Sequence, residues 1–223
     1  MRARSPLPGI RYPGGAAWLE QIVANTGRAV AAARASGTEA VHVRFQGRAW
    51  RQRDEALGRR PKCLEGSWGA EFAAGVEPRP GEAVFTRRAC FDAFLGDSFE
   101  RHLVARGVRH LLFAGLFADI CVDSTARTAF RKGFEATVLR DCTTGLHLPD
   151  EQVLSLMSRL YGARIATDDL AEAWSRRPGR GAEAVRVRQS GGVAGGSGPT
   201  VLVPTADGEN AQSAPRLGLF SLP

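Results

Sequence analysis

Apolar positions recur along this chain in two alternating rhythms. From Ala16 to about Ser36 they fall three or four residues apart, which predicts a helix that ends before Gly37. Short apolar runs rich in Val, Leu and Phe then alternate with further helical stretches. Strands are predicted at residues 39–45, 82–86, 110–117, 134–141 and 163–167, and further helices or helical turns at residues 68–74, 98–106, 119–132, 149–160 and 168–174.

The regular succession of helix and strand predicts an α/β protein with a doubly wound, mostly parallel sheet and helices on both faces. The run HLLFAGLF is nearly all apolar, as is typical of a strand in the buried centre of a parallel sheet. Reactive groups in such folds gather at the carboxyl ends of the strands, so a functional site is expected there.

Composition divides the chain into three parts. Residues 1–15 form an irregular N-terminal segment, residues 16–174 the predicted domain, and residues 175–223 a tail. The tail is rich in Gly, Pro, Ser and Ala and has no sustained apolar period, so it is predicted to be disordered. Its runs VRVR and TVLVP are expected to pair as strands only transiently.

Length and charge narrow the classes of function. The 223 residues, 43% hydrophobic and 24% charged, suit one soluble domain with a tail. The sequence has no apolar run long enough for a membrane helix and no secretory signal at its N-terminus, so a cytoplasmic protein without membrane partners is expected. The net charge of +7 comes from scattered Arg residues without interleaved aromatics, so nucleic-acid binding is not expected.

Cysteine and histidine give no sign of a metal site. Cys63, Cys90, Cys121 and Cys142 form no CxxC pair, and the four His residues do not cluster with them. We therefore predict neither a metal nor another cofactor. Each cysteine is expected to be a thiol in a reducing compartment, and the question is which of them is reactive.

Cys121 is the strongest candidate because of its position. An apolar strand runs into Gly115, a helix is predicted to begin near Asp119, and Cys121 falls in the first turn of that helix. Unpaired backbone N–H groups and the positive end of the helix dipole favour thiolate over thiol at such a place. The alternative is that Cys121 is a small apolar residue that packs the helix on the sheet.

The segment GLFADICVDSTARTAFRKGFEATVLRDC is similar to the signature of the isochorismatase-like cysteine hydrolases. The matching positions occur in the family's order, and the resemblance covers about residues 16–174. They are Gly115, Leu116, Asp119, Cys121, Val122, Gly133, Asp141 and Cys142. The resemblance implies a hydrolase of small-molecule amide, carbamoyl or related C–N bonds, with Cys121 as the nucleophile, and members of the family often form homo-oligomers.

The resemblance also implies the remaining site residues. A cis peptide bond is expected between Leu116 and Phe117, with the N–H groups of Phe117 and Cys121 as oxyanion donors. Phe91, Phe94 and Phe117 are expected to line the substrate pocket. The family's catalytic Lys corresponds to Arg88, which can hold a positive charge but cannot shuttle a proton at neutral pH. The adjacent Arg87 is an alternative for the residue that points inward.

One family feature has no counterpart at the expected place. Members of the family begin with an apolar strand that ends in a catalytic Asp. This chain has no Asp before Asp54, so we expect the first strand to be missing. Either the start codon is assigned too late, or the protein is a degenerate member that binds a small molecule or a protein partner without catalysis. The sequence does not identify the substrate.

Overall fold

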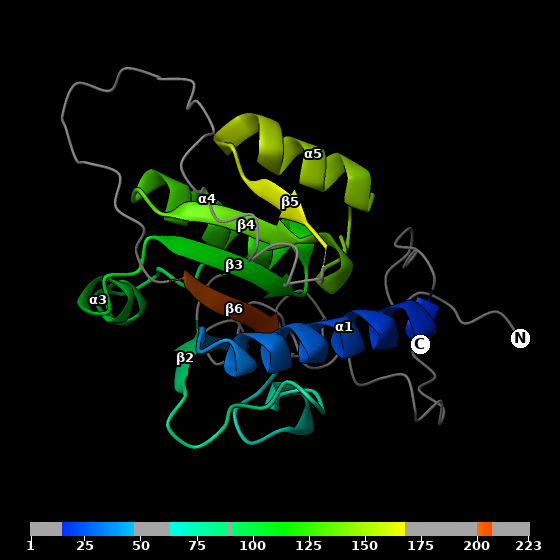
Figure 1. Ribbon diagram of the computed structural model, residues 1–223. Helices are drawn as coiled ribbons and strands as arrows, with labels where there is room; N and C mark the ends of the chain where they lie inside the picture. The colour runs from blue at the N-terminus through cyan, green and yellow to red at the C-terminus, as the bar shows by residue number, and fades with distance from the viewer. Residues whose placement is uncertain (1–14, 47–62, 89–90, 168–199, 207–223) are drawn as a thin grey trace, which may run out of the picture.

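The protein is built on one parallel sheet (Figure 1). Its structure is a computed structural model, which describes residues 15–46, 63–88, 91–167 and 200–206. The sheet has six strands in the order β2-β1-β6-β3-β4-β5, and every neighbouring pair is parallel. The doubly wound α/β prediction is confirmed. The strands are β1 (Glu39–Phe45), β2 (Ala83–Arg87), β3 (His110–Gly115), β4 (Glu135–Leu139), β5 (Arg164–Ala166) and β6 (Thr200–Ala206).

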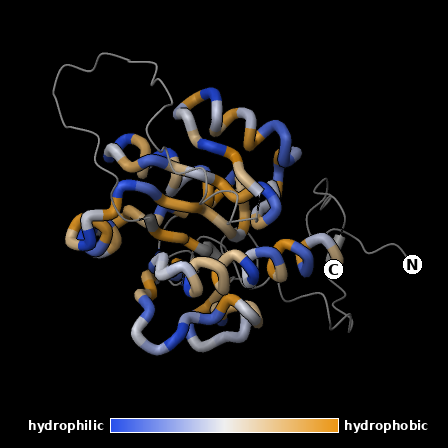
Figure 2. Tube along the Cα trace, in the orientation of Figure 1, coloured by the Kyte–Doolittle hydropathy of each residue, from blue (hydrophilic) through white to orange (hydrophobic). Residues whose placement is uncertain are grey.

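Helices cover both faces of the sheet. Helix α1 (Gly15–Ala35) lies on one face, where Ala29, Val30 and Ala33 pack on the sheet. The opposite face is covered by α3 (Ser98–Ala105), α4 (Asp123–Arg131) and α5 (Asp150–Tyr161), which share the larger core. Figure 2 shows mostly hydrophobic colours on the central strands, as expected for strands buried on both faces.

Strand β6 corrects two predictions. Residues 200–206 belong to the tail that was predicted to be disordered, yet they form a strand between β1 and β3, the place at the centre of the sheet. The sheet therefore does not lack a central strand, although no N-terminal strand precedes α1 among the described residues. The average composition of the tail concealed the short run Val201–Leu202–Val203, in which every residue is fully buried.

The other element predictions agree closely, with local exceptions. The predicted helix at 68–74 is only the short 3-10 turn η2 (Trp68–Ala70), in which Trp68 is 52% exposed. Residues 140–142 form a second short turn, η4 (Arg140–Cys142). The predicted turn at 168–174 and most of the predicted tail lie outside the described residues.

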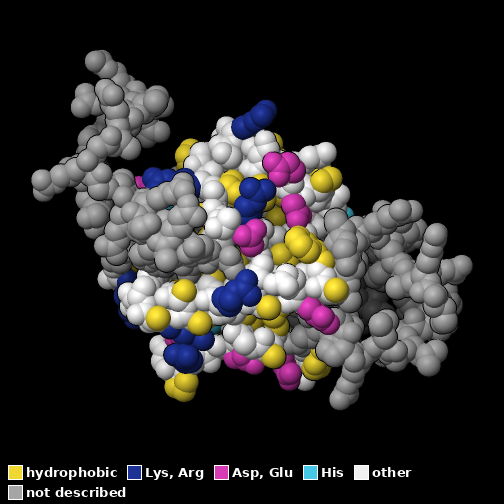
Figure 3. All heavy atoms as spheres, turned by 45° about the vertical axis from the view of Figure 1, so that its right-hand side comes forward, with side chains coloured by type: hydrophobic (Ala, Val, Ile, Leu, Met, Phe, Trp, Pro, Cys, Tyr) yellow, Lys and Arg dark blue, Asp and Glu magenta, His cyan; other side chains and the backbone are white. Residues whose placement is uncertain are grey.

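The face of the molecule that Figure 3 shows has no single basic patch among the described residues. In Figure 3, Lys and Arg side chains are interspersed with acidic and apolar ones among the described residues. None of the helices in the described ranges has the length and apolar content needed to cross a lipid bilayer.

A buried polar network fixes α1 to the edge of the sheet. Arg34 Nε donates to Glu82 Oε1 at 2.8 Å, and the buried His42 Nε2 lies 2.9 Å from Glu82 Oε2. The hydrogen bond from Arg34 lowers the pKa of the Glu82 carboxyl to about 2, and burial lowers the pKa of His42. His42 is thus a histidine of the buried core.

Replacing Glu82 with Gln is expected to remove an acid-sensitive part of the stability. The folded-state pKa of Glu82 lies below its ordinary value of 4.5. Its contribution is therefore full above pH 4.5 and is lost as the pH falls toward 2, with a size on the order of 2 kcal/mol. Urea unfolding of both proteins between pH 7 and pH 2 would show the difference shrink with acid. A difference that stays constant with pH would contradict this linkage.

Candidate active site

The turn after β3 presents Cys121 in an unusual backbone. Gly115 has a φ of 104°, a backbone conformation that favours glycine. The peptide bond between the two residues that follow, Leu116 and Phe117, is cis, as the resemblance implied. The chain then enters the π-helix η3 (Ala118–Val122), in which Val122 N–H donates to Phe117 O at 3.1 Å, before α4 continues. The helix start that was predicted near Asp119 is thus a wider π turn, and Cys121 lies inside it with no exposed surface.

This turn gives Cys121 the surroundings that nucleophilic thiols use. The π-helix runs directly into α4, so the thiol lies at the N-terminal end of a helical segment, where the backbone dipoles favour negative charge. Polar N–H groups of the same turn can stabilise an oxyanion. The assignment of the Phe117 and Cys121 N–H groups as the oxyanion donors stays a prediction.

Asp119 holds this turn against the loop that follows β4. Its carboxylate accepts hydrogen bonds from the N–H groups of Leu146, His147 and Leu148, at 2.8, 2.7 and 3.0 Å. Asp119 thus joins two segments at the carboxyl edge of the sheet, and the Ala118 N–H adds a hydrogen bond to Thr144 O at 2.8 Å.

Replacing Asp119 with Ala is expected to destabilise the protein by about 2 kcal/mol, because three N–H groups lose a charged acceptor. The loop and the turn that carries Cys121 would then separate more easily. Urea unfolding measures the loss of stability. Asp97→Ala is a suitable control, since the Asp97 side chain is 78% exposed and pairs with Arg101 of α3 at the surface.

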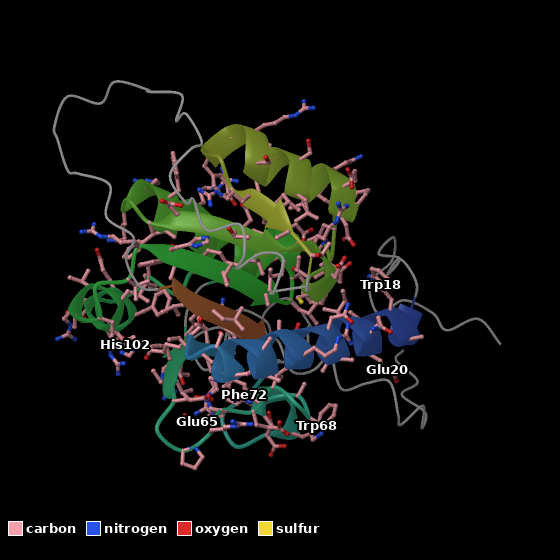
Figure 4. The ribbon with its side chains drawn as sticks, viewed as in Figure 1. Trp18, Glu20, Glu65, Trp68, Phe72 and His102 are labelled. Carbon is pink, nitrogen blue, oxygen red and sulfur yellow. The ribbon has the colours of Figure 1, made fainter. Side chains whose placement is uncertain are left out.

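The N-terminal half of α1 closes the turn from the other side. Leu19 and Ile22 pack on Leu116 and Phe117, and Phe117 is only 2% exposed. Trp18, labelled near the N-terminal end of α1 in Figure 4, donates from Nε1 to Thr144 Oγ1 at 3.2 Å. Helix α1 therefore stabilises both the cis-peptide segment and the loop after β4.

The two neighbouring arginines at the end of β2 point in different directions. The Arg88 side chain is 47% exposed, and its Nη1 donates to Glu65 Oε2 at 3.1 Å. Arg87 is only 4% exposed and donates from Nη1 to the carbonyl of Phe91 at 2.5 Å. The structure thus places Arg87, and not the predicted Arg88, on the inner side. Figure 4 labels Glu65 in the segment between β1 and β2.

The Phe91 carbonyl connects Arg87 to the helix that follows Cys121. It also receives the Thr125 hydroxyl at 3.5 Å, and Thr125 lies one turn after Cys121. Thr125 Oγ1 in turn accepts the Ala93 N–H at 3.2 Å. The buried guanidinium of Arg87 and the first turn of α4 are therefore both hydrogen-bonded to the same short segment, residues 91–93.

The three predicted pocket phenylalanines lie in different surroundings. Phe94 is buried in the main core, where its ring centroid lies 4.9 Å from that of Phe99. Phe91 is half-buried and lies beside Phe45, at 6.4 Å between ring centroids. Phe117 lies in the cis-peptide segment itself. That these three residues line the substrate pocket stays a prediction.

The described ranges contain two cysteines besides Cys121. Cys63 and Cys142 are buried, and Cys142 packs between α1 and the sheet. Cys90 lies outside the described residues. Within the described ranges, no group of three His, Cys, Asp or Glu side chains is placed to hold a metal ion.

The fold and this turn define a class: α/β proteins with a buried thiol at the carboxyl edge of a parallel sheet. Within that class, a sequence model of the isochorismatase domain matches residues 11–169. Ureidoacrylate amidohydrolase RutB of Enterobacter sp. (strain 638) is 30% identical over 179 residues, which is 70% of this chain and 76% of that protein. The chain therefore belongs to the isochorismatase family.

Further comparisons agree with this family. Ureidoacrylate amidohydrolase RutB of Variovorax paradoxus is 31% identical over 142 residues, or 54% of this chain, and the match spans 55% of that relative's length. An isochorismatase family protein from Desulfovibrio vulgaris is 28% identical, with a TM-score of 0.64 over 76% of this chain and 92% of that structure. N-carbamoylsarcosine amidase from Thermoplasma acidophilum, 24% identical, shares the fold with a TM-score of 0.62 over 69% of this chain and 86% of that structure.

Proposed function

We propose that the protein is an amidohydrolase that uses Cys121 to cleave a C–N bond of a small metabolite. The observation that carries this proposal is the geometry around Cys121: a fully buried thiol in a π turn after a cis peptide bond, at the carboxyl edge of the sheet. Its relatives bear the names of amidohydrolases and amidases, which supports the same type of reaction.

The proposed reaction has two stages. The Cys121 thiolate attacks the carbonyl carbon, the backbone N–H groups of the turn stabilise the resulting oxyanion, and the C–N bond then breaks. The leaving nitrogen departs with a proton, and the acyl group stays on sulfur as a thioester. Water then attacks the thioester, releasing a carboxylic or carbamic acid and regenerating the thiol.

Arg87 is the proposed source of positive charge. Because a guanidinium stays protonated at neutral pH, its contribution is electrostatic: it favours the thiolate and the developing negative charge. It cannot carry the proton of the thiol to the leaving nitrogen, so the reaction needs a separate base. The predicted role of Arg88 is transferred to Arg87 in this proposal.

The substrate class follows from the relatives only in outline. Two of these relatives are named for ureido and carbamoyl substrates, so we propose a small molecule with such a C–N bond. A homo-oligomer and a cytoplasmic location remain predictions.

Incubation of the full chain with ureidoacrylate, N-carbamoylsarcosine and nicotinamide, followed by intact-mass and peptide mass spectrometry, tests the proposal. Release of ammonia or carbamate together with a transient acyl adduct on Cys121 is expected for at least one compound class. If a compound binds and shifts the melting temperature, yet neither product nor adduct forms across a wide amide panel, the protein is a non-catalytic binder instead.

A further inference from the structure

Thr143, at the carboxyl end of β4, carries a buried hydroxyl group. The residue follows the short turn η4 and is only 1% exposed. Its Oγ1 has no hydrogen-bond partner among the described residues. Buried polar groups in folded proteins are nearly always hydrogen-bonded, because an unpaired one costs free energy. At the carboxyl edge of a parallel sheet, where ligands bind, such a group is available to a polar group of a ligand.

The hydroxyl of Thr143 differs in this respect from those of the other buried threonines in the described ranges. All four of the others are hydrogen-bonded within the fold. They are Thr26 (to Ile22 O at 2.8 Å), Thr125 (from Ala93 N–H at 3.2 Å), Thr137 (with His110 Nε2 at 2.7 Å) and Thr144 (to Asp150 Oδ1 at 2.9 Å). The fold therefore pairs the hydroxyl groups that serve its structure and leaves this one available.

The backbone directs the Thr143 side chain away from α1. Thr143 is extended, with a φ of −148° and a ψ of 159°, so its side chain and those of its two neighbours point to opposite sides. Both neighbours face α1, since Cys142 packs with residues of that helix and Thr144 Oγ1 accepts the Trp18 Nε1–H at 3.2 Å. Thr143 therefore points toward the other face of the sheet, where η3, α4 and α5 contribute to the larger core and where Figure 1 shows α5.

The segment that begins at Thr143 is hydrogen-bonded directly to the turn that carries Cys121. The carbonyl of the next residue, Thr144, accepts the Ala118 N–H at 2.8 Å, and Asp119 accepts three N–H groups further along the same loop. The thiol of Cys121 is fully buried, as the hydroxyl is. A small molecule that reaches the thiol therefore enters the part of the molecule in which the available hydroxyl lies.

We propose that Thr143 is a specificity-determining residue, whose hydroxyl accepts a hydrogen bond from an N–H group of the substrate while Cys121 attacks the carbonyl carbon. This inference rests on the proposed function. It defines the substrate class further, as a ureido, carbamoyl or carboxamide compound that presents an N–H group beside the reacting carbonyl. An ester of the same shape would leave the hydroxyl unpaired, so the site is expected to discriminate against it.

Thermal melting of Thr143→Val, compared with Thr137→Val, tests whether the hydroxyl is available. Valine has the shape of threonine without the hydroxyl, so Thr143→Val is expected to melt at or above the wild-type temperature. Thr137 is also buried and lies on β4, but its hydroxyl pairs with His110 Nε2, so Thr137→Val is expected to melt roughly 5 °C lower. An equal loss in Thr143→Val would show that the hydroxyl serves the fold and would overturn the inference.

Two alkylating probes test the preference for an N–H group without any hydrolysis. Iodoacetamide carries a carboxamide, whereas methyl iodoacetate carries an ester in its place. Thr143→Val is expected to slow the labelling of Cys121 by iodoacetamide about 5-fold and that by methyl iodoacetate less than 2-fold. Thr143→Ser retains the hydroxyl and is expected to restore the wild-type rates, and Thr137→Val is expected to label as the wild type does. An equal effect on both probes, or none, would contradict the proposed role.

Hydrolysis provides the last measurement. For an amide that the wild type cleaves, Thr143→Val is expected to lower kcat/KM about 10-fold, and Thr143→Ser to recover most of the loss. An unchanged kcat/KM in Thr143→Val would count against the inference. If the wild type cleaves no amide, the proposed function fails, whereas the two labelling rates still decide the role of Thr143.

Discussion

Replacing Cys121 with Ala is expected to reduce amide hydrolysis by about four orders of magnitude or more, because no covalent intermediate can form without the thiol. The variant is expected to fold, since Cys121 is fully buried in a turn whose backbone is held by Asp119 and α1, and the change removes a single sulfur atom. Steady-state rates with the best substrate measure the loss, and thermal melting verifies the fold.

Cys142→Ala is the matched control for this experiment. Cys142 is equally buried, but it belongs to the core cluster between α1 and the sheet. Its replacement is expected to cost about 1 kcal/mol of stability while kcat stays within a factor of a few of the wild type. Equal activity of the Cys121→Ala variant and the wild type would show that Cys121 is only a packing residue, the alternative that the sequence left open.

Replacing Arg87 is expected to have the next largest effect. Arg87→Ala removes a buried positive charge next to the segment that holds Thr125, so kcat is expected to fall roughly 100-fold. The Phe91 carbonyl also loses one of its two donors, which is expected to lower stability by about 1–3 kcal/mol. Arg87→Lys retains the charge and is expected to keep a larger part of the activity, which separates the electrostatic effect from the structural one.

Arg88→Ala provides the contrast, because the two arginines are adjacent in sequence and differ in burial. Arg88 is about half exposed and pairs with Glu65 at the surface, so its loss is expected to change stability by less than about 1 kcal/mol and kcat by less than twofold. A larger loss of kcat in Arg88→Ala than in Arg87→Ala would restore the assignment made from sequence spacing.

The fold could be predicted from sequence wherever a segment was long and its apolar period clear. Helix α1 and strands β1 to β5 follow patterns that depend only on local spacing, and the bounds agree within a few residues. The run that forms β6 is short and lies within a Gly-rich and Pro-rich tail, so composition outweighed three consecutive buried residues. Its β-branched, continuous apolar character was the signal that pointed to a central strand.

The turn around Cys121 could be predicted from the sequence, whereas the side chains that other strands and loops bring near it could not. The Leu116–Phe117 cis bond was implied by the resemblance, which rests on a contiguous stretch of sequence around Cys121. The inward direction of Arg87 depends on the pleat of β2 and on its pairing with β1, and a one-residue offset reverses the face of a strand. Phe94 could not be separated from Phe91 by sequence, since the choice depends on how α3 and α4 pack.

The position of β6 also constrains the order in which the protein can fold during synthesis. The ribosome makes β1 to β5 before β6, although β6 lies at the centre of the sheet. Until β6 is synthesised, the β2-β1 pair and the β3-β4-β5 group each have an inner edge whose backbone groups are unpaired. Strand β6 then pairs with both. The nascent chain is expected to depend on chaperones during this interval, since unpaired edges promote association between chains.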